Sequence, residues 1–135
     1  MNNRDRFRAI LRFEKVDRLP RFEWATWWDQ TIKRWQGEGL PGNLPPGKHG
    51  VVRVMEFFGL DPVWQWWFPI LRPSYPTMPH GMGPVADMAD YERIREHLYP
   101  DIDWEAAFPL EIRERHEKGE LAVWFTFDGY FWFAR

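Results

Sequence analysis

The sequence predicts an α/β fold in which parallel strands alternate with helices. Its first third, residues 6–41, shows a helical period, a short apolar run after a proline, and a second helical period closed by glycine and proline. Near the other end, residues 121–127 (LAVWFTF) are almost all apolar, which is typical of a strand buried on both faces of a parallel sheet. Strands separated by helices are the pattern of a parallel α/β domain.

The opening third predicts a helix over residues 4–14, a strand over residues 19–25 and a second helix that begins at Asp29. Apolar residues three and four apart indicate the first helix. We expect it to end before Pro20, because the residue that precedes a proline is disfavoured in helical conformation. Asp29 is a suitable N-cap for the second helix, and the run GEGLP at residues 37–41 ends it.

Three further helices are predicted from apolar spacing, at residues 51–58, 88–98 and 104–118. Within the last of these, Pro109 marks either a kink or the true start of a helix. Residues 60–86 combine several tryptophans with prolines at 69, 73, 76 and 79, which forbid a long helix or a central strand. We expect an aromatic turn there, with a short strand at residues 64–70, followed by extended loop.

Composition sets the broad class of protein. With 135 residues the chain is one domain by length, and its 18 basic and 20 acidic residues leave no basic surface for nucleic acid. No apolar run is long enough for a membrane span or a signal peptide. The absence of cysteine excludes disulfides, thiolate zinc sites and cysteine nucleophiles, and it fits a reducing compartment. We therefore expect a cytoplasmic protein that binds neither nucleic acid nor membrane.

Aromatic residues are unusually frequent: 10 Trp, 11 Phe and 4 Tyr. Such a chain either packs a dense aromatic core or leaves aromatic surface that requires a partner.

Several motifs resemble the amino-terminal segment of the uroporphyrinogen decarboxylase-like superfamily, a group that also includes corrinoid methyltransferases. They are DRLP at residues 17–20, TIKRW at 31–35, EGLP at 38–41, FFGLD at 57–61, the helix at 87–98, and LAVWFTFDGYFWFAR at 121–135. Members of this group are TIM barrels, so the resemblance implies the amino-terminal portion of a partial (β/α)8 barrel. A complete barrel needs about 250 residues. The apolar helix turn at residues 129–134 likewise suggests a fragment.

The resemblance implies a decarboxylase (a lyase) or a methyltransferase that is inactive until the remaining strands are supplied. True porphyrinogen decarboxylases carry arginines just after the first strand, whereas residues 25–29 (ATWWD) contain none. Binding a substrate with several carboxylates without cations is costly, so porphyrinogen is not expected. The zinc site of the methyltransferase branch does not carry over, and neither a metal nor another cofactor is expected.

Two carboxylates are candidate catalytic residues, because chemistry in a TIM barrel occurs at the carboxyl ends of strands. Glu23 lies on an apolar predicted strand, where partial desolvation would raise its pKa and favour acid–base work. Its alternative is a rim glutamate paired with Arg18 or Arg21. Asp128 follows the last strand and either faces the barrel mouth or caps the next helix.

Three further residues are candidates for substrate binding. Trp24 and Trp28 could stack on a flat ligand, although a tryptophan cluster also suits a core. His80 lies in a loop and could titrate near neutral pH. Two other hypotheses remain open: a small tryptophan-rich module that binds a sugar or an aromatic ligand, and a protein that completes itself by self-association or with a separate partner chain.

Overall fold

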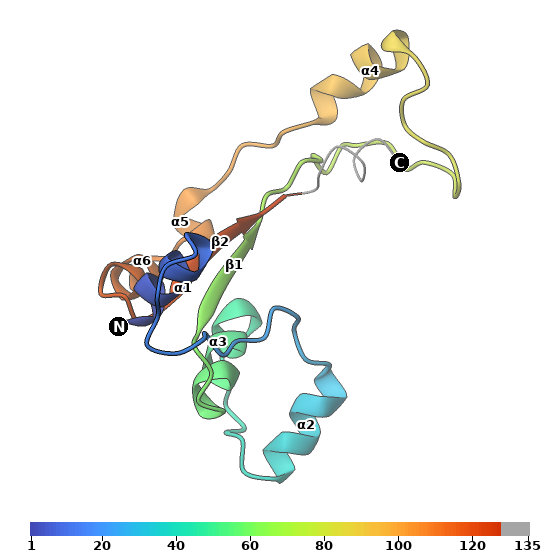
Figure 1. The fold of residues 1–135 in the computed structure, drawn as a ribbon. Coiled ribbons are helices and arrows are strands. Elements are labelled where there is room, and N and C mark those ends of the chain that lie inside the picture. Colours follow the sequence, from blue (N-terminus) through green and yellow to red (C-terminus); the bar gives the residue numbers. More distant parts are fainter. Residues whose placement is uncertain (128–135) are drawn as a thin grey trace. The chain divides into compact units, whose positions relative to one another are not determined.

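A computed structural model describes residues 1–127, which form six α-helices, one 3-10 helix and one two-stranded sheet (Figure 1). The helices are α1 (Asn3–Leu11), α2 (Asp29–Gly37), α3 (Gly47–Phe57), α4 (Met88–Ile94), η1 (Arg95–His97), α5 (Trp104–Ala107) and α6 (Leu110–Glu117). The strands are β1 (Val63–Trp67) and β2 (Ala122–Thr126). In this part of the chain, no helix has the length and apolar character needed to cross a membrane.

The prediction of a partial TIM barrel is wrong, because residues 1–127 form a small α/β arrangement with one pair of parallel strands. Residues 19–25, the expected first strand, are an extended connector. Both backbone groups of Arg21 bind Asp61: its carbonyl oxygen accepts from the Asp61 amide (2.6 Å), and its amide donates to the Asp61 carboxylate (2.8 Å). A strand forms backbone hydrogen bonds with a neighbouring strand at successive residues. Here the Arg21 amide binds the Asp61 side chain in place of a backbone carbonyl.

The two other expected strands are present, at Val63–Trp67 and Ala122–Thr126. The amide of Ala122 donates to the Pro62 carbonyl (3.2 Å), and the amide of Phe68 donates to the Thr126 carbonyl (2.8 Å). The paired residue numbers rise together along both strands, so the pairing is parallel.

The helices follow the sequence with shifted boundaries. α1 ends three residues before the predicted end, because Phe13 adopts a left-handed conformation (φ 58°). α3 begins at Gly47, four residues before the expected start. The helix expected over residues 104–118 is broken at Pro109, which stands as the N-cap of α6. This confirms Pro109 as a true helix start.

The chain divides into two compact units, and each is described by itself. The first unit contains residues 1–64 and 108–124, and the second contains residues 65–107 and the stretch that begins at Phe125. The core of the first unit is built where α3 and α6 meet the paired strand residues. Its buried members are Val52, Met55, Val63, Trp64, Ile112, Leu121 and Ala122. Burial of these apolar side chains is what holds the two strands against the helices.

α1 and α6 lie beside each other in the first unit (Figure 1). The Arg4 guanidinium donates to the carbonyls of His116 (3.1 Å) and Glu117 (3.0 Å) in the last turn of α6, and the His116 carbonyl also accepts from the Gly119 amide (3.0 Å). A cation at this end also complements the partial negative charge of the helix terminus. The side chain of Asn3 donates to the Glu120 carbonyl (2.9 Å), so the start of α1 closes over the end of α6.

The second unit is held by short-range caps and a few cross-links. Asp87 caps α4 by accepting from the Asp90 amide at 2.9 Å. Leu71 and Leu98 form an isolated antiparallel bridge, and the Arg72 side chain donates to the Leu98 carbonyl at 3.0 Å. The ring of Phe68 packs against Phe125 with centroids 5.3 Å apart.

Candidate functional site

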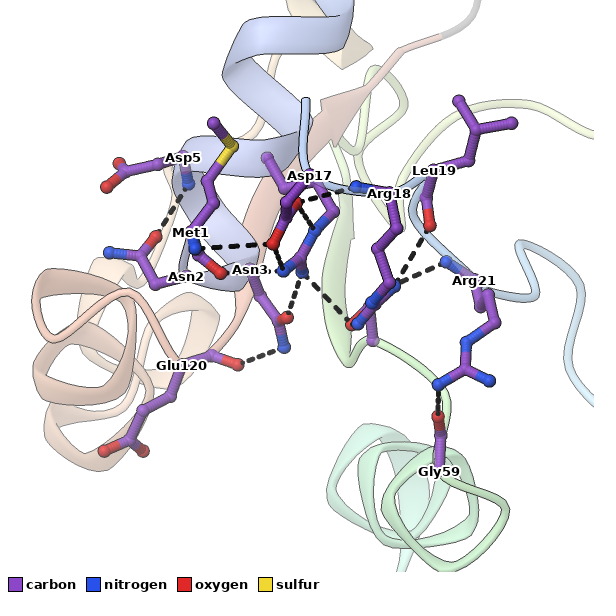
Figure 2. Close-up of polar contacts among 12 residues, drawn as sticks. Met1, Asn2, Asn3, Asp5, Asp17, Arg18, Leu19, Arg21, Gly59 and Glu120 are labelled. Carbon is purple, nitrogen blue, oxygen red and sulfur yellow. Dashed lines mark hydrogen bonds and ion pairs between the residues drawn. The ribbon is translucent and has the colours of Figure 1, made fainter. Parts of the chain in front are cut away.

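A polar network in the first unit surrounds Arg6, an α1 residue that is only 5% exposed. Figure 2 draws its members Met1, Asn3 and Asp17 as sticks. The Arg6 guanidinium forms a two-pronged pair with Asp17, with Nε–Oδ1 and Nη2–Oδ2 distances of 2.9 Å each. It also donates to the Asn3 side chain (2.9 Å) and the Met1 carbonyl (2.7 Å). A buried guanidinium whose donors are satisfied in this way is stabilising rather than costly.

Asp61, which lies four residues after the end of α3, extends the network to the connector. It is 3% exposed and receives two hydrogen bonds of 2.6 Å from the Arg18 guanidinium. Its carboxylate also accepts from the Arg21 amide (2.8 Å) and lies 3.5 Å from Arg6 Nη1. Two arginines therefore share two aspartates, and the Met1 amino group adds a third cation 3.4 Å from Asp17 Oδ2.

The pKa values follow from these contacts. The hydrogen bond from Arg6 holds the pKa of Asp17 well below its usual range. The hydrogen bonds from Arg18 lower the pKa of Asp61, and this outweighs the opposing effect of burial. Both carboxylates are ionised at neutral pH and saturated with donors. The network therefore suits a structural clamp on residues 17–21 rather than proton transfer.

Glu23 lies on the connector beyond this clamp and is half-buried. Its Oε1 accepts from the amides of Trp24 (3.0 Å) and Ala25 (3.3 Å). Within residues 1–127 neither Arg18 nor Arg21 contacts it, because Arg18 binds Asp61 and Arg21 binds the Gly59 carbonyl. The carboxylate shapes the local turn, and its role as an acid or base stays a prediction.

Trp24 and Trp28 both precede α2, which begins at Asp29, and they are 69% and 81% exposed. Neither ring contacts another aromatic ring within residues 1–127. Trp27, between them, packs instead against the core formed by Met55 and Val63. The segment thus places one tryptophan inside and leaves two rings available to a ligand.

The remaining predicted residues are not brought to this segment. His80 is exposed in a loop of the second unit. Asp128 lies outside the residues that the structure describes.

One polar arrangement in the second unit was not predicted. Ser74 Oγ lies 3.0 Å from His97 Nδ1, and His97 Nε2 lies 3.6 Å from Glu96 Oε1. A hydroxyl, an imidazole and a carboxylate in series resemble the order of a nucleophilic triad. Ser74 is exposed and Glu96 is 77% exposed, so water surrounds the group and it lacks the desolvated setting that such chemistry uses. Ser74 lies 22 and 23 residues before the adjacent Glu96 and His97, and no sequence motif links it to them.

Among residues 1–127, no group of three or more histidine, aspartate or glutamate side chains is arranged to hold a metal ion. Comparisons with protein-family models, with characterised proteins and with solved structures find no match to this chain.

Proposed function

We propose that this chain is an assembly-dependent component of a uroporphyrinogen decarboxylase-like enzyme, of the decarboxylase or methyltransferase class. It would contribute residues of the connector, Glu23 among them, to a small-molecule site in the cytoplasm. It would not catalyse the reaction by itself. Association comes either from a second copy of the chain or from a complementary chain.

The observation that carries the proposal is the small size of the sheet. Within residues 1–127 the sheet has two strands, β1 and β2. Two strands in isolation are only marginally stable, and parallel strands occur almost always in larger sheets with both faces covered. An open parallel edge favours addition of a further strand.

Exposed aromatic rings at the strand ends support the same proposal. Trp67 and Phe125 are each 52% exposed, and Phe127 is 67% exposed. All three belong to the second unit. Trp67 lies at the carboxyl end of β1, and Phe125 and Phe127 lie at the carboxyl end of β2. Covering apolar surface of this kind releases about 25 cal/mol per Å².

The family assignment rests on the resemblance, and one contact is consistent with it. DRLP and FFGLD are separate motifs in the sequence. In space, Arg18 of the first motif pairs with Asp61 of the second.

Sedimentation velocity from about 1 to about 100 μM tests the proposal, because an assembly-dependent chain shows concentration-dependent association. Phe125→Glu should weaken association about tenfold or more, equivalent to about 1.4 kcal/mol. Leu11→Glu is the matched control, since Leu11 is 79% exposed at the last residue of α1. A wild-type chain that stays monomeric throughout would refute association with a second copy. A cooperative melt of that monomer would refute dependence on either kind of partner, because the chain would then be stable by itself.

A second candidate is a tryptophan-rich binding module, which the exposure of Trp24 and Trp28 favours. Such rings stack on sugars or flat aromatic ligands. Under this alternative, Trp24→Ala and Trp28→Ala abolish ligand binding and leave sedimentation unchanged. Red-shifted tryptophan emission that returns to shorter wavelength on adding ligand would distinguish it from the first proposal.

A further inference from the structure

A pocket of about 230 Å³ lies between α2, α3 and the loop that joins them, within the first unit. Five apolar side chains line it: Trp27, Ile32, Leu44, Val51 and Val54. Gln36 is the one polar side chain among the described lining residues, and the others are glycines and prolines. None of the lining residues belongs to β1 or β2.

The packing of the surrounding chain builds this pocket. Gly50 allows the loop to approach α3, because a Cβ there would stand 2.3 Å from the Pro45 carbonyl oxygen. On the other side, the Trp27 ring is held edge-on by Trp35, with centroids 5.8 Å apart. Trp35 in turn packs on Phe58 at 4.7 Å. The walls are therefore fixed by close backbone and ring contacts that do not depend on an occupant.

The size and charge of the pocket restrict its occupant. A buried apolar cavity of about 150 Å³ binds benzene in another protein, so a pocket of about 230 Å³ has room for one substituted ring or two fused rings. No lining residue within residues 1–127 carries a charge. A charged ligand would lose hydration without gaining a counter-charge, which favours a neutral one.

Gln36 adds a polar requirement. Its amide nitrogen donates to the Pro41 carbonyl at 3.4 Å, while its carbonyl oxygen receives no hydrogen bond from residues 1–127. A half-buried acceptor without a donor is satisfied by water or by a donor on the ligand. We infer that this pocket binds a neutral aromatic molecule of one or two rings that carries one hydrogen-bond donor, as phenols and indoles do. The ring packs beside Trp27 and the donor binds Gln36.

Titration of the full chain with phenol and with toluene, followed by calorimetry and by two-dimensional NMR, tests this inference. The two ligands have nearly the same shape, and phenol alone donates a hydrogen bond. For the wild-type chain we expect saturable binding of one phenol per chain, with a Kd of about 1 mM. Gln36→Leu should weaken phenol binding about fivefold and leave toluene binding within about twofold.

Two variants complete the design. Gln30→Leu makes the same change on an exposed position of α2 outside the pocket and should alter neither ligand's binding. Ile32→Trp fills the pocket and should abolish binding of both ligands while far-UV circular dichroism stays unchanged.

The inference is overturned if the wild-type chain binds neither phenol nor toluene up to about 10 mM, roughly ten times the expected Kd. It is also overturned if Gln36→Leu weakens both ligands equally or weakens neither. The inference does not rest on the proposed function, because Phe125→Glu changes no lining residue. Phenol binding should therefore persist in that variant whether or not the chain associates.

Discussion

Replacing Asp61 by asparagine should destabilise the first unit more than any comparable polar change on its surface. The substitution keeps the shape of the side chain and removes its charge. Asp61 is 3% exposed and accepts two 2.6 Å hydrogen bonds from Arg18. Asparagine would leave Arg18 and the neighbouring Arg6 without their shared carboxylate, and its amide group would face the guanidinium donors.

The magnitude follows from what each arginine retains. Removing one partner of a buried ion pair typically costs about 3–5 kcal/mol. Arg6 keeps its pair with Asp17, and the Arg18 side chain is 40% exposed and can turn to water. The lower end therefore applies, about 3 kcal/mol in the free energy of unfolding. With a urea dependence of about 2 kcal/mol per molar, the unfolding midpoint falls by about 1.5 M.

Urea unfolding followed by tryptophan fluorescence measures this change. Glu14→Gln is the matched control, since Glu14 is exposed in an irregular segment of the same unit, and it should shift stability by less than about 0.5 kcal/mol. A double-mutant cycle with Arg18→Met separates the pair itself from the other contacts of Asp61. If Asp61→Asn lies within about 0.5 kcal/mol of the wild type, the network does not clamp the connector, and the reasoning fails.

Two further predictions concern acid and a helix end. The pKa values of Asp17 and Asp61 are lowered in the folded chain, so the stability that they supply is complete above about pH 5 and is lost as the pH falls below about 4. The urea midpoint should therefore fall on acidification, and Asp61→Asn should flatten this dependence; parallel curves for the two proteins would contradict it. Gly119 has a φ of 80°, and a Cβ there would lie 2.4 Å from the Asn2 side chain that caps α1. Gly119→Ala should cost about 2–3 kcal/mol, against about 1–2 kcal/mol for Gly81→Ala, which has φ 84° and open space; equal costs would show that the cap is not displaced.

The candidate site was only partly accessible to reasoning from the sequence. The sequence did not show that Trp24 and Trp28 are exposed while Trp27 is half-buried against the core. Three tryptophans so close together suit a core equally well. The pocket was missed, because its walls come from α2, α3 and the glycine- and proline-rich loop between them. No single motif encodes a space between elements. A glycine where the loop meets a helix, here Gly50, was the available signal, since a close backbone approach needs it.

Local chemistry in the sequence determined where most elements stand. Asp87 caps α4, Pro109 separates α5 from α6, and Gly119 follows the end of α6. The prediction of Asp29 as the N-cap of α2 is wrong: Asp29 is the first residue of the helix, and Trp28 occupies the N-cap position without a side-chain cap bond. The apolar run that contains β2 was equally visible. Each of these signals acts over a few residues, through a cap, a missing amide or a permitted left-handed conformation.

Only the tertiary structure decided whether an extended segment becomes a strand. Residues 19–25 have strand-like composition, and their fate depended on Asp61, which binds Arg21 from 40 positions away. The same residue joins Arg18 and Arg6, which lie 43 and 55 positions from it. Pairing partners at such separations are set by how the helices pack, because a strand and an ion pair both require a second group that local sequence does not specify.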